Sequence, residues 1–107
     1  MNIKTYLTDW QRSYLDDLTN NIMPFWMEHG LDRVNGGVYT CVDCDGTLID
    51  TTKSVWFQGR FGFIAAYAYN NISNNQEWLM ASKSCIDFII DHCTDANGRM
   101  YFEVKAD

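Results

Sequence analysis

The feature that most constrains this chain is the run of residues 54–70, which has helical length and is apolar on nearly every side. Val55, Trp56 and Phe63 mark one face, and further apolar residues occupy the other. The only charged residue between Val55 and Tyr69 is Arg60. A helix that is apolar all round is normally buried on most sides. We therefore expect residues 54–70 to form an inner helix covered by other elements.

Arg60 needs an explanation inside such a helix, because a desolvated guanidinium requires a partner or a water-filled cavity. One interpretation is a cavity that binds an oxyanion or the hydroxyls of a sugar and is lined by Trp56, Phe57, Phe63 and Arg60. Trp56 and Arg60 are four residues apart and so lie on one helix face. The other is a structural clamp between Arg60 and a carboxylate such as Asp45 or Asp50. Core packing with a cation–π contact explains the Trp56–Arg60 spacing equally well.

Two further helices flank this segment in the sequence. Apolar residues recur at three- and four-residue spacing over residues 5–29, with an expected kink or break near residues 20–23 because Pro24 lacks an N–H, and an expected end at Gly30. Residues 76–93 read as an amphipathic helix. Its expected buried stripe consists of Trp78, Leu79, Cys85, Ile86, Ile89 and Cys93.

Turn residues between these helices indicate short hairpins. A turn at residues 35–37 precedes an expected strand at 38–42, an Asp-Gly turn at 43–46 and a returning strand at 47–49. A second turn at 95–98 is followed by an expected strand at 100–104. A hairpin turn should then begin at 105–107, so the chain is predicted to end in mid-hairpin. The alternation of helices and hairpins suggests a helical repeat with hairpins in its loops.

Composition excludes several classes of function. The 107 residues carry a net charge of −6, and the Lys and Arg residues are scattered, which argues against nucleic-acid binding. No apolar run approaches the ~20 residues of a membrane helix, and the first ten residues lack the apolar stretch of a secretory signal. We therefore expect a cytoplasmic protein without a membrane or nucleic-acid partner.

The cysteines and histidines do not form a recognisable metal or catalytic motif. Cys41 and Cys44 make a lone CxxC without the second close pair that a structural zinc site needs, and four free thiols are the favoured reading. His29 and His92 each close a predicted helix, where a cation meets the negative end of the helix dipole. A structural role is therefore expected for both histidines, and no metal site is predicted.

Three blocks of sequence resemble the amino-terminal region of the N-acylglucosamine 2-epimerase family. They are MPFWMEHGLD at 23–32, GGVYTCVDCDGTLID at 36–50 and KSVWFQGR at 53–60. The resemblance implies an all-α fold, the (α/α)6 toroid, in which six inner and six outer helices alternate. Residues 1–107 would then be a partial domain, roughly the first quarter, with about three helices and short β-hairpins in the connecting loops.

The resemblance also implies an activity, the interconversion of N-acetylglucosamine and N-acetylmannosamine by removal and return of the proton at C2. Arg60 matches the active-site arginine of the family, which makes it the expected catalytic residue and, with Trp56, an expected substrate-binding residue. The two histidines that serve the family as acid and base lie in a part of the family sequence with no counterpart here. No cofactor is required in the family, and ATP acts as an effector in some members.

Other readings stay open. Cellobiose 2-epimerases and mannose isomerases share the same fold, and a non-catalytic interaction module is a further alternative. A chain with about three helices leaves the inner helix uncovered, which predicts self-association of this piece or a homodimer of a longer chain. We expect the 107 residues, as a truncated epimerase, to be inactive alone.

Overall fold

The computed structural model describes residues 2–105 of the chain. The helices are α1 (Ile3–Asp17), η1 (Leu18–Ile22), α2 (Met23–His29), α3 (Val55–Asn71) and α4 (Gln76–His92). The strands are β1 (Cys41–Val42), β2 (Leu48–Asp50), β3 (Lys53–Ser54) and β4 (Glu103–Val104). The fold is therefore mainly helical with short hairpin strands in the loops, as the sequence predicts.

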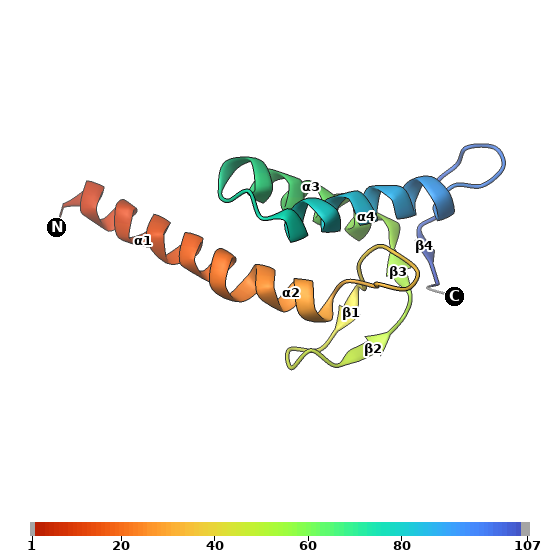
Figure 1. Cartoon of the computed structure of the whole chain (residues 1–107), viewed down its shortest axis with the longest axis horizontal. Helices are drawn as coiled ribbons and strands as arrows, with labels where there is room; N and C mark the ends of the chain where they lie inside the picture. The colour runs from red at the N-terminus through yellow and green to blue at the C-terminus, as the bar shows by residue number, and fades with distance from the viewer. Residues whose placement is uncertain (1, 106–107) are drawn as a thin grey trace.

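The helices form two groups in space. α3 and α4 lie side by side, and the continuous rod of α1, η1 and α2 reaches away from them toward the N-terminus (Figure 1). The molecule is consequently elongated, with extents of 58 × 29 × 25 Å. α1 buries none of its residues. Within residues 2–105, no helix has both the length and the apolar character needed to cross a membrane.

The disturbance expected at Pro24 is present, but the chain stays helical through it. η1 is one turn of wider π-helix, in which the N–H of Met23 donates to the carbonyl of Leu18, five residues earlier. Pro24 follows directly in the first turn of α2, so the wider turn accommodates the missing N–H without ending the helical rod. Gly30 ends α2 as predicted, and a Cβ there would lie 2.3 Å from a ring carbon of Trp26.

The core lies between α3, α4 and α2. Phe61, Ala65 and Ala68 of α3 pack against α4, and Met23 and Met27 of α2 complete the cluster. Among the described residues, the opposite face of α3 meets only the segment 100–102 near its start, and Trp56, Phe63 and Tyr67 remain exposed there. These three residues are not buried as the apolar pattern predicts, and they form the uncovered part of the inner helix that a chain with about three helices is expected to leave.

The buried stripe of α4 also differs from the prediction. Leu79 and Ile86 are exposed, whereas Phe88, which the prediction omits, is buried. The full buried set is Trp78, Ala81, Ser82, Cys85 and Phe88. The Phe88 ring lies over the Lys53 ammonium, at 4.5 Å from Nζ to the ring centroid.

The first hairpin forms where the Asp-Gly turn predicts it. β1 and β2 pair antiparallel, with Cys41 opposite Asp50 and Val42 opposite Leu48. Gly46 in the turn has a φ of +94°, a left-handed conformation that glycine adopts without strain. The predicted strand at 38–42 is shorter than expected, since Val38 makes only an isolated bridge to Leu31.

The final strand finds its partner far back in the chain. β4 pairs antiparallel with β3, with Lys53 opposite Val104 and Ser54 opposite Glu103. The strand expected at 100–104 is thus shorter than predicted and has a partner before α3. The prediction that the chain ends in mid-hairpin stays a prediction, because residues 106 and 107 of the expected turn at 105–107 lie outside the described residues.

Candidate functional site

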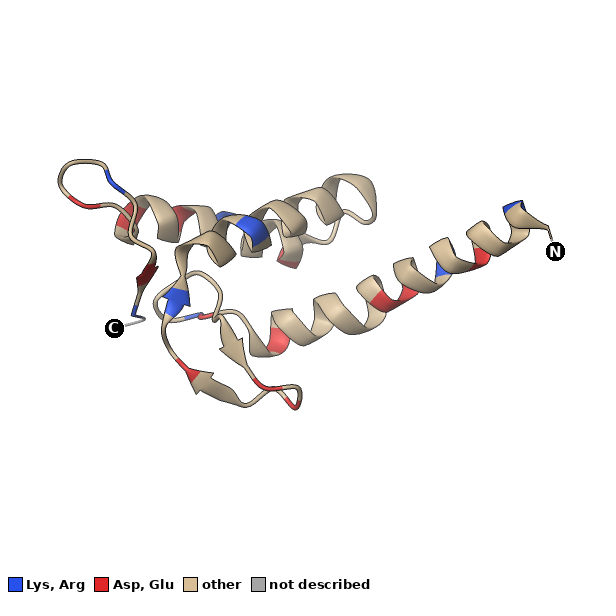
Figure 2. Cartoon of the chain, turned by 180° about the vertical axis from the view of Figure 1, so that it is seen from behind, with Lys and Arg blue, Asp and Glu red and all other residues tan. Residues whose placement is uncertain are grey.

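A groove of about 740 Å³ opens beside the first half of α3. One wall is the exposed face of α3, and the other is the segment 100–102, which precedes β4. The lining residues are Val55, Trp56, Gly59, Arg60, Phe63, Ile64, Ile89, Met100, Tyr101 and Phe102. Arg60 is the one charged side chain among them. α3 is tan apart from a single blue turn in Figure 2, because Arg60 is its only charged residue.

Trp56 and Arg60 meet on the groove face as their spacing predicts, and Phe63 lines the groove with them. Phe57, which the cavity interpretation also includes, packs instead on Trp26 and Phe61. The guanidinium carbon of Arg60 lies 4.2 Å from the centroid of the Trp56 ring, and Trp56 is 64% exposed. The clamp alternative does not form: Asp45 accepts from the N–H of Thr47, and Asp50 accepts from the N–H of Thr52. Arg60 is absent from the ion pairs of residues 2–105, so its donors face the groove and solvent.

The second wall of the groove was not predicted from the sequence. The N–H of Val55 donates to the carbonyl of Phe102 at 3.1 Å, and the N–H of Tyr101 donates to that of Cys93 at 2.9 Å. These bonds hold the segment along the start of α3 and leave the ring of Phe102 83% exposed. Only the long-range pairing of β4 with β3 brings these aromatic residues to Arg60, which is why no local pattern reveals them.

A buried ion pair lies beneath the start of α3. The Lys53 Nζ donates to Asp32 Oδ2 at 2.7 Å and to the carbonyl of Gly36 at 2.7 Å, and the two charged side chains are 0% and 1% exposed. Burial acts to raise the pKa of Asp32, but hydrogen bonds from the Asn35 N–H, Lys53 and the Val34 N–H outweigh it and lower that pKa to about 2. The Asp32 carboxyl is therefore ionised at neutral pH, and in that form it holds the loop that follows it through the N–H groups of Val34 and Asn35.

Gln58 fixes the same loop from α3. Its Oε1 accepts from the N–H of Val38 at 2.8 Å, and its Nε2 donates to the carbonyl of Val38 at 2.6 Å. From α4, Ser84 Oγ accepts from the N–H of Gly37 at 3.0 Å. Lys53 and Gln58 both belong to the KSVWFQGR block. A lysine just before an apolar helix and a glutamine within it are the sequence features that could have predicted these buried polar contacts.

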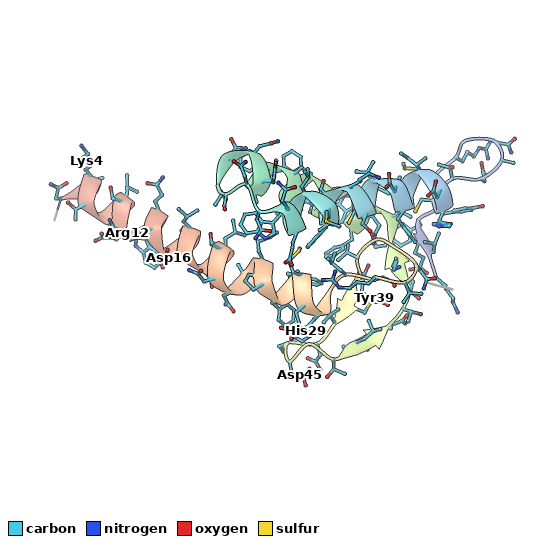
Figure 3. All side chains as sticks on the ribbon, in the orientation of Figure 1. Lys4, Arg12, Asp16, His29, Tyr39 and Asp45 are labelled. Carbon is cyan, nitrogen blue, oxygen red and sulfur yellow. The ribbon has the colours of Figure 1, made fainter. Side chains whose placement is uncertain are left out.

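The two histidines lie away from the groove. His29, at the end of α2, packs on the ring of Phe25 at 5.0 Å and against the hairpin turn at Gly46. Figure 3 shows His29 beside Asp45, near the hairpin and far from the α1 residues Lys4, Arg12 and Asp16. His92 packs on Phe88 at 5.0 Å. Both side chains stand in the last turn of a helix, in keeping with the structural role expected for them.

The cysteines are four free thiols, as favoured from the sequence. Burial raises the pKa of Cys85 to about 12 and also raises that of Cys93. Cys44 is exposed in the hairpin, and Cys41 is half-buried. No group of three or more His, Cys, Asp or Glu side chains within residues 2–105 is arranged to hold a metal ion.

Comparison with known proteins identifies relatives of this chain, although no protein-family model matches it. N-acylglucosamine 2-epimerase of Rattus norvegicus is 32% identical over 85 residues, which is 78% of this chain and 20% of that enzyme. The enzyme of the same name from Homo sapiens is 30% identical over 86 residues, again 78% of this chain and 20% of the enzyme. The chain is related to the N-acylglucosamine 2-epimerases. It spans about a fifth of the length of these relatives.

Solved structures of related epimerases share the fold. A sugar epimerase from a ruminal bacterium superposes with a TM-score of 0.76 at 28% identity, covering 88% of this chain and 24% of that one. Cellobiose 2-epimerase from Spirochaeta thermophila superposes with a TM-score of 0.78 at 25% identity, covering 92% and 25%. A D-mannose isomerase at 22% identity and a TM-score of 0.76 supports the fold alone. This relative of the N-acylglucosamine 2-epimerases thus has the structure of about a quarter of an (α/α)6 toroid.

Proposed function

We propose that the chain forms part of a sugar 2-epimerase that interconverts N-acetylglucosamine and N-acetylmannosamine, and that Arg60 and Trp56 bind the sugar. The observation that carries the proposal is the groove itself. It presents one guanidinium that no carboxylate of residues 2–105 pairs with, stacked on an exposed indole, in an otherwise apolar lining. A flat aromatic surface beside a fork of N–H donors suits a pyranose or its open-chain form.

The chemistry gives Arg60 a defined task. Removal of the proton at C2, next to an aldehyde, moves negative charge onto the aldehyde oxygen, and return of a proton on the opposite face inverts C2. A fixed guanidinium stabilises that developing charge more strongly than it stabilises the neutral aldehyde, which lowers the barrier. Arg60 is therefore proposed as the catalytic electrostatic residue, and Trp56 as the surface that orients the carbon chain.

Proton transfer requires a base and an acid that this groove does not supply from its own lining. His29 and His92 are held elsewhere by their contacts with the hairpin and with Phe88. We infer that the acid and base come from residues beyond this segment, by analogy with the longer epimerases. The prediction for the 107-residue chain alone is therefore no measurable epimerisation. ATP as an effector stays a prediction, since we assign no ATP site.

The uncovered apolar faces support a second proposal, that the isolated chain self-associates. Trp56, Phe63 and Tyr67 are exposed on α3, and α1 exposes Trp10 and Tyr14. Large exposed apolar patches on a soluble chain commonly mark protein–protein contacts. Light scattering after gel filtration of the 107-residue chain should give a mass above 12.4 kDa, and a stable monomer would contradict the proposal.

The test of the proposed function uses a full-length chain in which residues 1–107 replace the matching segment of the rat epimerase. The measurement is exchange of the C2 proton of N-acetylmannosamine with deuterated solvent, followed by NMR. Arg60→Ala should abolish exchange and preserve the circular dichroism spectrum. Arg12→Ala, which removes an exposed arginine on α1, is the matched control and should leave exchange unchanged. A folded parent chain without activity would contradict the proposed function.

A further inference from the structure

The apolar pattern of α3 does not by itself decide which side of the helix faces inward. Val55, Phe61 and Ala65 are buried against the rest of the molecule, yet Trp56 and Phe63 on the opposite face are larger in apolar area and lie exposed. The hydrophobic effect is non-directional and scales with apolar area. Apolar area alone therefore does not fix the rotation of α3. Polar groups must decide it, both Arg60, whose burial on the aromatic face would cost free energy, and any group that holds the opposite face inward.

We propose that Gln58 is a positioning residue that sets the rotation of α3 and thereby keeps Trp56 and Arg60 on the groove face. Gln58 and Arg60 are two residues apart, which places their side chains about 200° apart around the helix axis. An interaction that holds the Gln58 side chain toward the core therefore also holds the Arg60 side chain toward the groove. The role of Arg60 in that groove rests on the proposed function, but the positioning of α3 does not.

The contacts of Gln58 have the directionality that apolar packing lacks. Its side chain is 0% exposed and pairs with both the N–H and the carbonyl of Val38, at 2.8 and 2.6 Å. A side-chain amide thus takes the place of a neighbouring strand, because it carries one donor and one acceptor side by side. If α3 turned about its axis, both backbone groups of the buried Val38 would lose their partners.

The loop that Gln58 binds is also held by three hydrogen bonds with two other side chains. Lys53 ties it through Asp32 Oδ2 and the carbonyl of Gly36, and Ser84 of α4 accepts from the N–H of Gly37. The backbone at Gly37 also approaches closely, since a Cβ there would lie 2.6 Å from Gln58 Oε1. The loop is therefore a rigid reference against which the rotation of α3 is set. A buried polar group that selects one arrangement of apolar helices has precedent in coiled coils.

The test compares Gln58→Leu with Ser82→Ala in the 107-residue chain. Both variants remove buried hydrogen bonds that involve α3, because Ser82 Oγ donates to the carbonyl of Gly62 at 2.7 Å. Only Gln58→Leu releases the loop. The readouts are the melting temperature and the NMR signals of the Trp56 indole N–H and the Arg60 Nε–H, assigned with Trp56→Phe and Arg60→Lys.

Positioning predicts that Gln58→Leu shifts both groove-face signals, whereas Ser82→Ala lowers the melting temperature and leaves them in place. Unmoved signals in Gln58→Leu, or equal shifts in the two variants, would overturn the proposal and leave Gln58 as a purely structural residue. If Gln58→Leu does not fold, Gln58→Glu takes its place in the test. Glutamate keeps the acceptor for the Val38 N–H but loses the donor to the Val38 carbonyl, and it should shift the same signals at neutral pH. Loss of C2 exchange in a longer chain tests the proposed function separately.

Discussion

The buried pair of Lys53 and Asp32 gives the sharpest stability prediction. In Lys53→Met, the Asp32 carboxylate stays buried but loses the ammonium 2.7 Å away. Breaking a buried pair by removing one partner typically costs about 3–5 kcal/mol. Lys53 is one of several groups that lower the pKa of Asp32 to about 2, beside the N–H groups of Asn35 and Val34, so Lys53→Met should raise that pKa only part of the way back. A loss of this size is a large part of the ~5–15 kcal/mol by which small domains are stable.

The assay is urea denaturation at pH 7, followed by circular dichroism. The matched control is Lys83→Met, which removes an exposed lysine paired with Asp87 on the surface of α4. The control should change the free energy of unfolding little, because an exposed pair is screened by water. The double variant Lys53→Met with Asp32→Leu should recover much of the loss, because no charge is then left buried.

The pH dependence has a definite sign. A carboxyl whose pKa is lower in the folded state contributes stability above its unfolded value, near 3.8, and loses that contribution as the pH falls toward 2. The difference in free energy of unfolding between the wild-type chain and Lys53→Met should therefore become smaller as the pH is lowered from 4 to about 2. The reasoning is refuted if Lys53→Met loses no more stability at pH 7 than Lys83→Met.

Two further predictions concern the turns and the thiols. Gly46→Ala and Gly98→Ala both place a side chain at positive φ, at a cost of ~1–2 kcal/mol, but only at Gly46 does the new Cβ meet the His29 ring, at 2.5 Å. Gly46→Ala should therefore lower the melting temperature more than Gly98→Ala does. Equal decreases in melting temperature would show that the His29 ring moves aside without a cost in stability. With Ellman's reagent, Cys44 should react in the native protein and Cys85 only after denaturation, because burial raises the pKa of Cys85 to about 12. Prompt reaction of Cys85 would mean that the α3–α4 interface opens readily.

The parts of the fold that the sequence predicts correctly depend on local chemistry. The extent of α3, the disturbance at Pro24 and the Asp-Gly turn each follow from residues within a few positions of one another. The Trp56–Arg60 contact is of the same kind, because a spacing of four residues places both side chains on one helix face.

The parts that the sequence does not predict depend on long-range contacts. β4 pairs with β3 across fifty residues of chain, and this pairing brings Phe102 to the groove. The inward face of α4 includes Phe88, whose ring meets the Lys53 ammonium from a distant part of the chain. The inward face of α3 was ambiguous because its apolar residues lie on both sides. Buried polar groups such as Gln58 resolve that ambiguity only once their partners are known.

The central claim is that Arg60 supplies the electrostatic half of a sugar epimerase site, and C2 exchange tests it most directly. N-acetylmannosamine in deuterated water is incubated with a full-length chain that carries residues 1–107, with and without Arg60→Ala. We predict exchange in the parent chain and its loss in Arg60→Ala, with the same melting temperature in both. Exchange at near-parent rates in a folded Arg60→Ala variant would contradict the account.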